Sequence, residues 1–177
     1  MRVVAGLAKG RRLVAPPGLD TRPTSDRVRE ATFNALESMG AIQDAVVLDL
    51  FAGTGALGIE ALSRGAAACT FVDADRRCIE AIETNVDACG FRAQATIVRT
   101  EALVFLRSDK HVDLALLDPP YAFGDWHLLF AALDAGLAVI ESDRPVDPGP
   151  GRRTVRTKRY GGTVVAIIAP DTAAKEP

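Results

Sequence analysis

Short apolar runs alternate with amphipathic stretches over most of the chain. From residue 45 onward, the pattern predicts strands at 45–50, 68–73, 95–99, 112–118, 137–141, 152–158 and 163–169. Helices are predicted at 55–64, 75–89, 101–108 and 125–135. Apolar strands that alternate with helices are typical of a parallel sheet covered on both faces, which is a doubly wound α/β fold. No helix separates the last two strands, and Gly161 and Gly162 between them indicate an antiparallel hairpin.

The first 40 residues follow a different pattern. Two short strands are predicted there, at Val3–Ala5 and Arg12–Ala15, and an amphipathic helix that ends at Gly40 comes after them. A two-stranded ribbon is only marginally stable alone, so we expect it to pack against the main domain or a partner. We therefore expect a small basic β-hairpin extension over residues 1–20, followed by one domain over residues 21–177.

Composition excludes several classes of protein. The 177 residues are 48% hydrophobic and 25% charged, which is typical of a globular domain and too apolar for a disordered chain. No apolar run reaches the roughly 18 residues needed to cross a bilayer, and the first residues lack a hydrophobic signal core. Three cysteines and two histidines do not match the spacing of a zinc site. We expect a monomeric cytoplasmic protein with neither a metal ion nor a membrane partner.

Basic residues are concentrated in the first segment, although the net charge of the chain is only −2. Residues 1–30 contain seven Lys and Arg against three acidic residues. Four of these cations are candidates for sequence-independent contacts with the phosphates of a nucleic acid, namely Lys9, Arg11, Arg12 and Arg22. The alternative is an ordinary solvated surface hairpin.

A second basic segment, residues 152–159, contains five Lys and Arg and no acidic residue. Regular strand alternation predicts two faces, one with Arg152, Thr154, Arg156 and Lys158 and the other with Arg153 and Arg159. Such a strand is either a second nucleic-acid contact or a sheet edge protected by charge, and the sequence favours neither.

A glycine-rich loop, DLFAGTGALG at 49–58, follows the first strand of the main domain. Gly53 and Gly55 permit a tight turn and close approach of a ligand to the backbone. With Gly58 they also match the G-x-G-x-x-G fingerprint of dinucleotide-binding proteins. Asp49, the first residue of this segment, would repel a pyrophosphate. It would favour a ligand that carries a cationic centre and an ammonium group.

Acidic residues also follow the next two strands. Asp73, about twenty residues after the loop, can accept hydrogen bonds from both hydroxyls of a ribose. The nearby Asp75 is better explained as the N-cap of the following helix. Glu101 could reach an adenine amine, but a capping or surface role explains it equally well.

The sequence Asp118-Pro119-Pro120-Tyr121 ends the fourth strand, where ligands bind in such sheets. Alone, it could be a rigid turn, because two prolines end both helix and sheet. Beside the glycine loop it fits methylation of a nucleobase amine, whose lone pair is delocalised into the ring. The Asp118 carboxylate and the Pro119 carbonyl would accept its two N–H groups and direct the lone pair toward a methyl group. Tyr121 would stack on a base removed from its helix, which is worth about 1–3 kcal/mol.

The glycine loop together with DPPY resembles the S-adenosylmethionine-dependent amino-methyltransferases, whose signature is [DNS]-P-P-[YFW]. Three longer segments, RVVAGLAKGRRL, RPTSDRVREATFNAL and LDLFAGTGALGIEALSRGA, are similar to the RsmD family, which methylates the N2 amine of a guanine in 16S ribosomal RNA. The resemblance is good over residues 1–125 and extends to 126–177 only in pattern. DPPY indicates the reaction type, because enzymes that act on adenine in DNA, guanine in RNA or glutamine in proteins share it.

This resemblance implies the class I methyltransferase fold, a Rossmann-like doubly wound sheet of seven strands, with S-adenosylmethionine as the cofactor. The cofactor-binding positions that it implies are Asp49, Phe51, Gly53, Gly55, Asp73, Glu101, Ala102 and Thr24. The catalytic positions that it implies are Asp118, Pro119 and Tyr121.

Two residues of the first helix are also implied, Arg29 and Asn34, which would line the cofactor or target side. A salt bridge from Arg29 to Asp26 or Glu30 explains that arginine about as well. The implied partner is 16S ribosomal RNA, and we expect the assembled 30S subunit rather than naked RNA as the substrate.

Other functions remain possible at this stage. The enzyme could methylate another amine, such as adenine N6 in DNA or RNA or a protein glutamine, although the basic segment favours nucleic acid over protein. A NAD-dependent oxidoreductase would use the same glycine loop, but it would leave DPPY unexplained and lacks an evident catalytic His or Tyr-Lys pair. An inactive RNA-binding module is disfavoured by the intact motifs.

Overall fold

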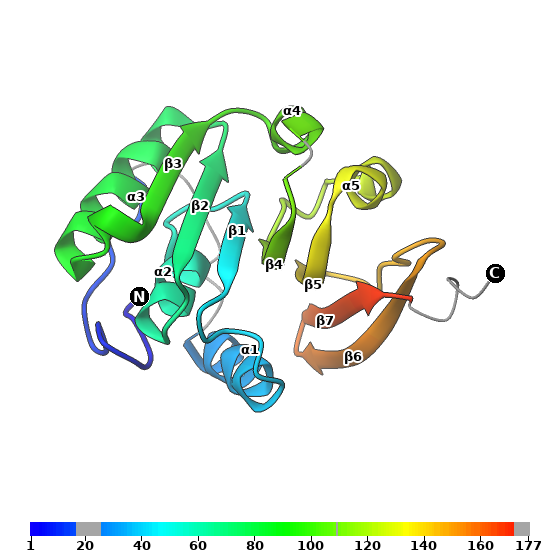
Figure 1. The fold of residues 1–177 in the computed structure, drawn as a ribbon, viewed down its shortest axis with the longest axis horizontal. Helices are drawn as coiled ribbons and strands as arrows, with labels where there is room; N and C mark the ends of the chain where they lie inside the picture. Colours follow the sequence, from blue (N-terminus) through cyan, green and yellow to red (C-terminus); the bar gives the residue numbers. More distant parts are fainter. Residues whose placement is uncertain (17–25, 109, 172–177) are drawn as a thin grey trace.

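A seven-stranded sheet forms the centre of the structure, a computed structural model that describes residues 1–16, 26–108 and 110–171 (Figure 1). Its strands are β1 (Val46–Leu50), β2 (Ala68–Asp73), β3 (Ala95–Arg99), β4 (Val112–Leu117), β5 (Ala135–Ser142), β6 (Arg152–Tyr160) and β7 (Thr163–Pro170). They are arranged in the order β3-β2-β1-β4-β5-β7-β6. Strands β1 to β5 run parallel, and β7 runs antiparallel to β5 and β6.

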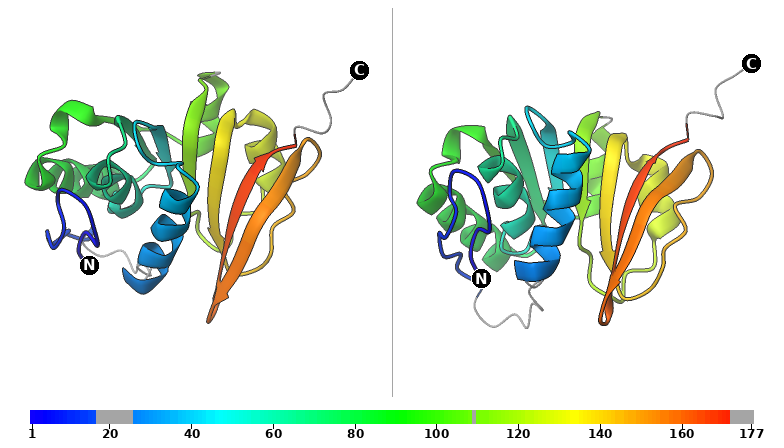
Figure 2. Two further views of the ribbon diagram at one scale, coloured as in Figure 1. Left: turned by 60° about the horizontal axis from the view of Figure 1, so that its bottom comes forward. Right: turned by 90° about the horizontal axis from the view of Figure 1, so that it is seen from below.

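Helices cover both faces of this sheet (Figure 2). They are α1 (Asp26–Ser38), α2 (Ala56–Ser63), α3 (Arg76–Cys89), α4 (Ala102–Phe105) and α5 (Trp126–Ala132), with short 3-10 turns at Arg92–Gln94 and Leu106–Ser108. Helices α1, α2 and α3 share one hydrophobic core with the sheet, and α4 and α5 share the other. None of the described helices is long and apolar enough to span a membrane.

The central strands are apolar throughout because their alternate side chains enter different cores. In β1, Val47 packs into the core under α2, whereas Leu48 and Leu50 pack into the core on the opposite face. Strand β1 lies between β2 and β4, so the connections that follow β1 and β3 run toward opposite edges of the sheet. The carboxyl ends of β1 and β4 therefore form the switch point where ligands bind in doubly wound sheets.

The doubly wound α/β fold predicted from the sequence is confirmed, including the hairpin from β6 to β7 on Gly161 and Gly162. The two strands predicted in the first segment are wrong. That segment contains a single antiparallel bridge, between Arg2 and Arg12, and otherwise consists of turns and irregular backbone. A few backbone hydrogen bonds join its two arms, such as those from Val3 to Arg11 and from Leu13 to Met1, and contacts to the main domain hold it in place.

The predicted faces of residues 152–159 are also wrong, because β6 contains a bulge. Thr154 lies opposite Ile168 and Arg156 opposite Ile167, so Val155 is an extra residue in the strand. The bulge transfers Arg156 and Lys158 to the face of Arg153. Arg152 is half-buried, and its guanidinium donates to the Phe130 and Leu133 carbonyls at the end of α5.

The first segment, residues 1–16, is attached to α2 through two buried polar side chains, Glu60 and Ser63. The Glu60 carboxylate accepts from the Val4 and Ala5 amides at 2.8 and 3.0 Å. The Ser63 hydroxyl accepts from the Ala8 amide at 2.9 Å. The segment thus packs against the main domain, as expected for a ribbon that cannot be stable alone.

Asn85 of α3 connects the end of this segment to the glycine loop. Its amide exchanges two hydrogen bonds with the backbone of Val14 and donates a third to the Thr54 carbonyl at 2.9 Å. At the other end, the Thr54 hydroxyl lies 3.7 Å from the Met1 sulfur. The position of the first segment is therefore coupled to the loop that follows β1.

Candidate active site

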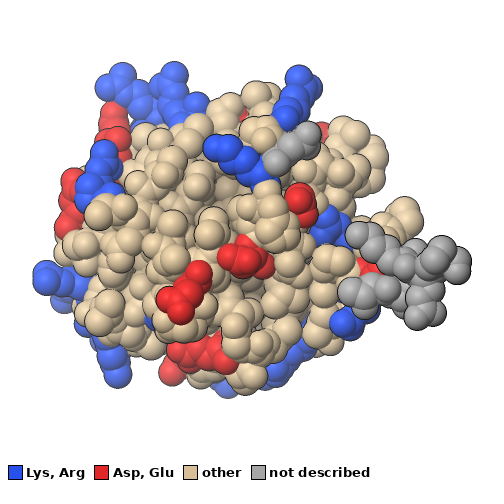
Figure 3. Space-filling model, in the orientation of Figure 1, with Lys and Arg blue, Asp and Glu red and all other residues tan. Residues whose placement is uncertain are grey.

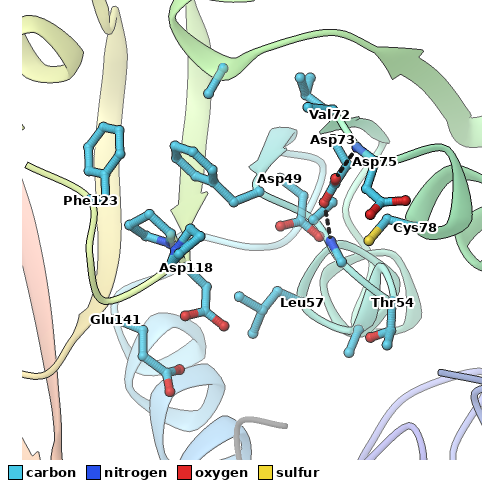
Figure 4. A pocket seen from close by; sticks show the side chains of 18 of the residues that line it. Asp49, Thr54, Leu57, Val72, Asp73, Asp75, Cys78, Asp118, Phe123 and Glu141 are labelled. Atoms are coloured by element: carbon cyan, nitrogen blue, oxygen red, sulfur yellow. Dashed lines mark hydrogen bonds between the residues drawn. The ribbon is translucent and has the colours of Figure 1, made fainter. Parts of the chain in front are cut away.

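A cavity of about 940 Å³ opens at the carboxyl ends of β1, β2, β4 and β5. The loops after β1, β3 and β4 form most of its wall, and Met1 and Arg29 contribute from the first segment and α1. Figure 4 shows the side chains of these elements directed into one shared space. A cavity at the switch point, lined by both motifs, is the candidate active site.

The glycine loop is bent by three residues with left-handed backbone angles, Phe51 (φ 60°), Gly53 (φ 56°) and Gly55 (φ 74°). Gly55 precedes α2, where its conformation turns the chain into the helix. Gly58 is required for a different reason, because a Cβ there would lie 2.3 Å from the Phe71 ring and 2.6 Å from the Cys69 sulfur. The third glycine thus permits close packing of α2 on β2.

Asp73 fixes this loop from the end of β2. Its carboxylate accepts from the Gly53 amide at 2.8 Å and from the Asp75 amide at 2.9 Å. A carboxylate has about four lone-pair positions, so Asp73 can also accept from a ligand. Asp75 caps α3 by accepting from the Arg77 amide at 2.8 Å, as predicted, and hydrogen bonds from Arg77 lower the Asp75 pKa to about 2.

The DPPY segment forms a turn at the end of β4, in which the Phe123 amide donates to the Pro120 carbonyl at 2.8 Å. Pro119 is buried, and Tyr121 is 40% exposed at the cavity wall. Phe123 packs edge-on against Phe51 of the glycine loop and against Trp126 of α5, with ring centroids 5.2 Å apart in both pairs. Aromatic contacts therefore connect the two motifs directly.

The cavity is strongly acidic. Of the described side chains that line it, seven are carboxylates, and Arg29 is the one Lys or Arg. Figure 3 shows acidic side chains in the middle of this face of the molecule and most Lys and Arg around its margin. Such a wall favours cationic ligands and ligands rich in N–H donors, and disfavours a pyrophosphate.

In this acidic wall, the ionised form of Asp49 is destabilised. Asp49 is 1% exposed and accepts from the Gly58 amide at 2.9 Å. Burial raises the pKa of its carboxyl group well above the usual value, and the charges of Asp118 and Asp73 raise the pKa further. A positive charge in the cavity would oppose this effect by favouring the ionised form of Asp49.

Comparison with known proteins agrees with this geometry. The family described as "Conserved hypothetical protein 95" matches residues 1–169. The chain belongs to this family, the RsmD family. YlbH of Bacillus subtilis (strain 168), provisionally named an rRNA methyltransferase, is 38% identical over 181 residues, which cover 94% of this chain and 97% of YlbH.

Two further members extend the comparison. "Ribosomal RNA small subunit methyltransferase D" of Escherichia coli (strain K12) is 40% identical over 126 residues, which cover 70% of this chain and 62% of that protein. The solved structure of yhhF from Escherichia coli, provisionally titled a methyltransferase, superposes with a TM-score of 0.84 and 33% identity over 97% of this chain and 98% of yhhF. The class I methyltransferase fold is therefore shared over nearly the whole chain.

Most positions that the RsmD resemblance indicated lie together in the cavity wall. They are Asp49, Phe51, Gly53, Asp73, Glu101, Ala102, Asp118, Pro119 and Tyr121. Gly55 is buried behind the wall, against Phe71 and Ile82. Lys9, Arg11 and Arg12 are exposed on the first segment. Thr24 and Arg22 lie outside the described residues.

Arg29 both lines the cavity and forms a salt bridge to Asp26. Its fully buried guanidinium lies 2.9 Å from the Asp26 carboxylate and 3.6 Å from that of Glu60. Asn34 instead accepts from Arg64 at the protein surface, at 3.1 Å. The interaction of Arg29 with Glu60 joins α1, α2 and the first segment, and sequence spacing gives no signal for it.

Cys78 and Glu141 are among the cavity residues that the sequence analysis missed. The Cys78 thiol is buried beside Asp73 and Asp75, and burial together with these charges raises its pKa to about 12, so it stays a neutral thiol. Glu141 lines the cavity at the end of β5. Its signal was its position, at the end of an apolar strand next to the strand that carries DPPY.

Proposed function

We propose that this protein transfers a methyl group from S-adenosylmethionine to the N2 amine of a guanine in 16S ribosomal RNA. The observation that carries the proposal is the position of Asp118 and Pro119 in an acidic cavity beside the glycine loop. The names of the RsmD relatives support ribosomal RNA of the small subunit as the substrate. We propose the assembled 30S subunit in the cytoplasm as the target.

The cavity wall fits S-adenosylmethionine better than a dinucleotide. Asp49, Phe51 and Gly53 would surround the methionine part, where Asp49 would offset the positive charges of the ligand. Asp73 would accept the ribose hydroxyls, and Glu101 with Ala102 would lie beside the adenine. When bound, this cofactor supplies a methyl group on a positively charged sulfur.

The target amine would be held by the DPPY turn. The Asp118 carboxylate and the Pro119 carbonyl would accept its two N–H groups, which favours a pyramidal nitrogen whose lone pair is available for the new N–C bond. The nitrogen gains a methyl group and loses one proton, which the Asp118 carboxylate can accept. Tyr121, exposed at the cavity wall, would stack on the guanine.

Asp49→Asn is expected to stabilise the protein without its cofactor and to weaken cofactor binding about tenfold or more. The raised pKa means that ionising Asp49 destabilises the folded state, increasingly so as pH rises above about 4. The gain in melting temperature should therefore be a few degrees at pH 7 and vanish near pH 3. Asn can still accept from Gly58. Melting curves across pH and calorimetric titration test both effects, and an unchanged melting temperature at pH 7 would contradict the argument.

The first segment would bind RNA phosphates through Lys9, Arg11 and Arg12, which are exposed. Replacing all three by Gln is expected to weaken RNA binding and to reduce the slope of log K against log salt by about one unit for each lost contact. Arg76→Gln with Arg92→Gln, both exposed at α3 and the turn after it, is the control. Binding of small subunits would be measured between 50 and 200 mM salt, roughly the range over which such contacts weaken. An unchanged slope would contradict RNA binding by this segment.

The decisive experiment maps labelled methyl groups. Small subunits from cells that lack this protein are incubated with it and with S-adenosylmethionine that carries a labelled methyl group, and the rRNA is digested and sequenced. One guanine should carry the label as N2-methylguanine. Label on adenine N6 would support the alternative amine. Calorimetric binding of NAD without binding of S-adenosylmethionine would overturn the proposal.

A further inference from the structure

Glu141 occupies a defined place beside the catalytic turn. Strands β4 and β5 are paired in parallel with Leu117 opposite Ile140, so the next residues, Asp118 and Glu141, lie at the same level of the sheet. The two preceding side chains, Leu116 and Val139, enter the core on the α1 face. Strand alternation therefore places both carboxylates on that face, and Figure 4 shows both directed toward the same part of the cavity.

A carboxylate at this place has no role in holding the cofactor as proposed above. Asp49, Asp73 and Glu101 belong to the wall formed at the carboxyl ends of β1, β2 and β3, whereas Glu141 lies near the end of β5, on the other side of Asp118. It also borders a small hollow lined by Pro119, Pro120 and Tyr121. Glu141 thus lies where the target base would extend beyond its amine.

Bases differ in what they present beside the amine. In guanine, the N2 amine is flanked by N1–H, which is a hydrogen-bond donor. In adenine, the N6 amine is flanked by N1 and N7, which carry lone pairs and accept hydrogen bonds. An ionised carboxylate can only accept, so it attracts the guanine edge and repels the adenine edge. A mismatch of this kind leaves buried polar groups unpaired and gives strong discrimination.

We infer that Glu141 selects guanine by accepting a hydrogen bond from its N1–H while Asp118 and Pro119 hold the amine. This inference rests on the proposed function and deepens it, because the DPPY turn itself treats adenine and guanine amines alike. Glu141 is then a specificity residue that contacts the substrate, and the pair of carboxylates at the ends of β4 and β5 distinguishes this cavity from one for adenine.

The test replaces the target guanine in reconstituted small subunits by 2-aminopurine, which keeps the N2 amine but lacks N1–H and the O6 atom. The wild-type protein should lose roughly 10- to 100-fold in kcat/KM on this base, the range for a hydrogen bond to a charged group. Glu141→Gln offers both an acceptor and a donor, so its ratio between the two bases should fall to within a few-fold. Glu141→Asp, which keeps the carboxylate, should still prefer guanine.

Asp134→Asn is the matched control, because it removes the same charge from an exposed carboxylate directly before β5, outside the residues that line the cavity, where it lies 2.9 Å from His111. It should retain the wild-type ratio. The loss of O6 affects all variants alike. The difference in base ratio between wild type and Glu141→Gln therefore reports the N1–H contact alone. Melting temperature and binding of S-adenosylmethionine are measured for each variant.

The results of this test distinguish a failure of the Glu141 inference from a failure of the proposed function. Guanine N2 methylation with an equal base ratio in wild type and Glu141→Gln would overturn this inference and leave the proposed function standing. Loss of activity of Glu141→Gln on both bases, with normal folding and cofactor binding, would also overturn it, because Glu141 would then act in the reaction itself. Absence of N2-methylguanine with the wild-type protein would overturn the proposed function, and this inference with it.

Discussion

Asp118→Ala is expected to lower kcat/KM for methyl transfer by about a hundred- to a thousandfold or more, with cofactor affinity within a few-fold of wild type. The carboxylate is the preorganised acceptor for the amine, and removing one such group from an active site has effects of this size. The alanine variant leaves the Pro119 carbonyl as the single acceptor of the pair. Single-turnover transfer of a labelled methyl group measures the rate, and calorimetry measures the affinity.

Asp113→Ala is the control on the same strand. Asp113 is an exposed carboxylate near the start of β4, where it accepts from the Val46 amide at 2.8 Å, far from the cavity wall at the strand's end. It should lower stability slightly and leave kcat/KM unchanged. Wild-type transfer by Asp118→Ala would contradict the amine-holding arrangement, and equal losses in both variants would indicate a general effect of damaging β4.

The fold was predictable from the sequence because a doubly wound sheet imposes a simple pattern. Its central strands must be apolar on both faces, and the helices between them need one apolar face, so strands and helices were found near their true limits. Functional groups in this fold gather at the carboxyl ends of strands. The positions of Asp49, Asp73 and Asp118 at such ends were therefore sufficient to place them in one cavity.

The first segment could not be predicted in the same way. Its shape depends on side chains more than 50 residues away, such as Glu60 and Ser63, which look like ordinary positions of an amphipathic helix. Gly6 shows how specific the fit is, because a Cβ there would lie 1.8 Å from the Ser63 carbonyl oxygen. The segment is nevertheless attached to the main domain at several points, as expected for a ribbon that is not stable alone.

The bulge in β6 could not be predicted from the sequence, for a related reason. An extra residue in a strand is revealed by its partner strand, and neither Val155 nor its neighbours in sequence carry a signal for it. The consequence for function is that Arg153, Arg156 and Lys158 share one face, while Arg152 is engaged with α5. The charged edge is therefore divided differently from the prediction.

Glu60→Ala is expected to destabilise the protein by about 3–5 kcal/mol, the range for breaking a buried ion pair. Glu60 is fully buried and lies 2.8 Å from Arg64, whose side chain is 2% exposed, and 3.6 Å from the fully buried Arg29. Its loss leaves the amides of Val4 and Ala5 without their acceptor. It also removes the buried carboxylate that the two arginines share, so that Arg29 keeps only the half-exposed Asp26 and Arg64 only the half-exposed Glu37 as acidic partners among the described residues. Urea unfolding measures the change in free energy.

Glu80→Ala supplies the comparison, because Glu80 and Arg76 form an Arg–Glu pair with the same separation along α3, also at 2.8 Å, but exposed to solvent. It should change stability by no more than about 0.5 kcal/mol. If Glu60→Ala and Glu80→Ala lower the free energy of unfolding by the same small amount, Glu60 does not anchor the first segment. If Glu60→Ala alone is destabilised and also binds RNA more weakly, then the buried carboxylate couples the stability of α2 to the segment proposed to contact the substrate. Since Asn85 and Met1 connect that segment to Thr54 of the glycine loop, cofactor affinity should fall in the same variant.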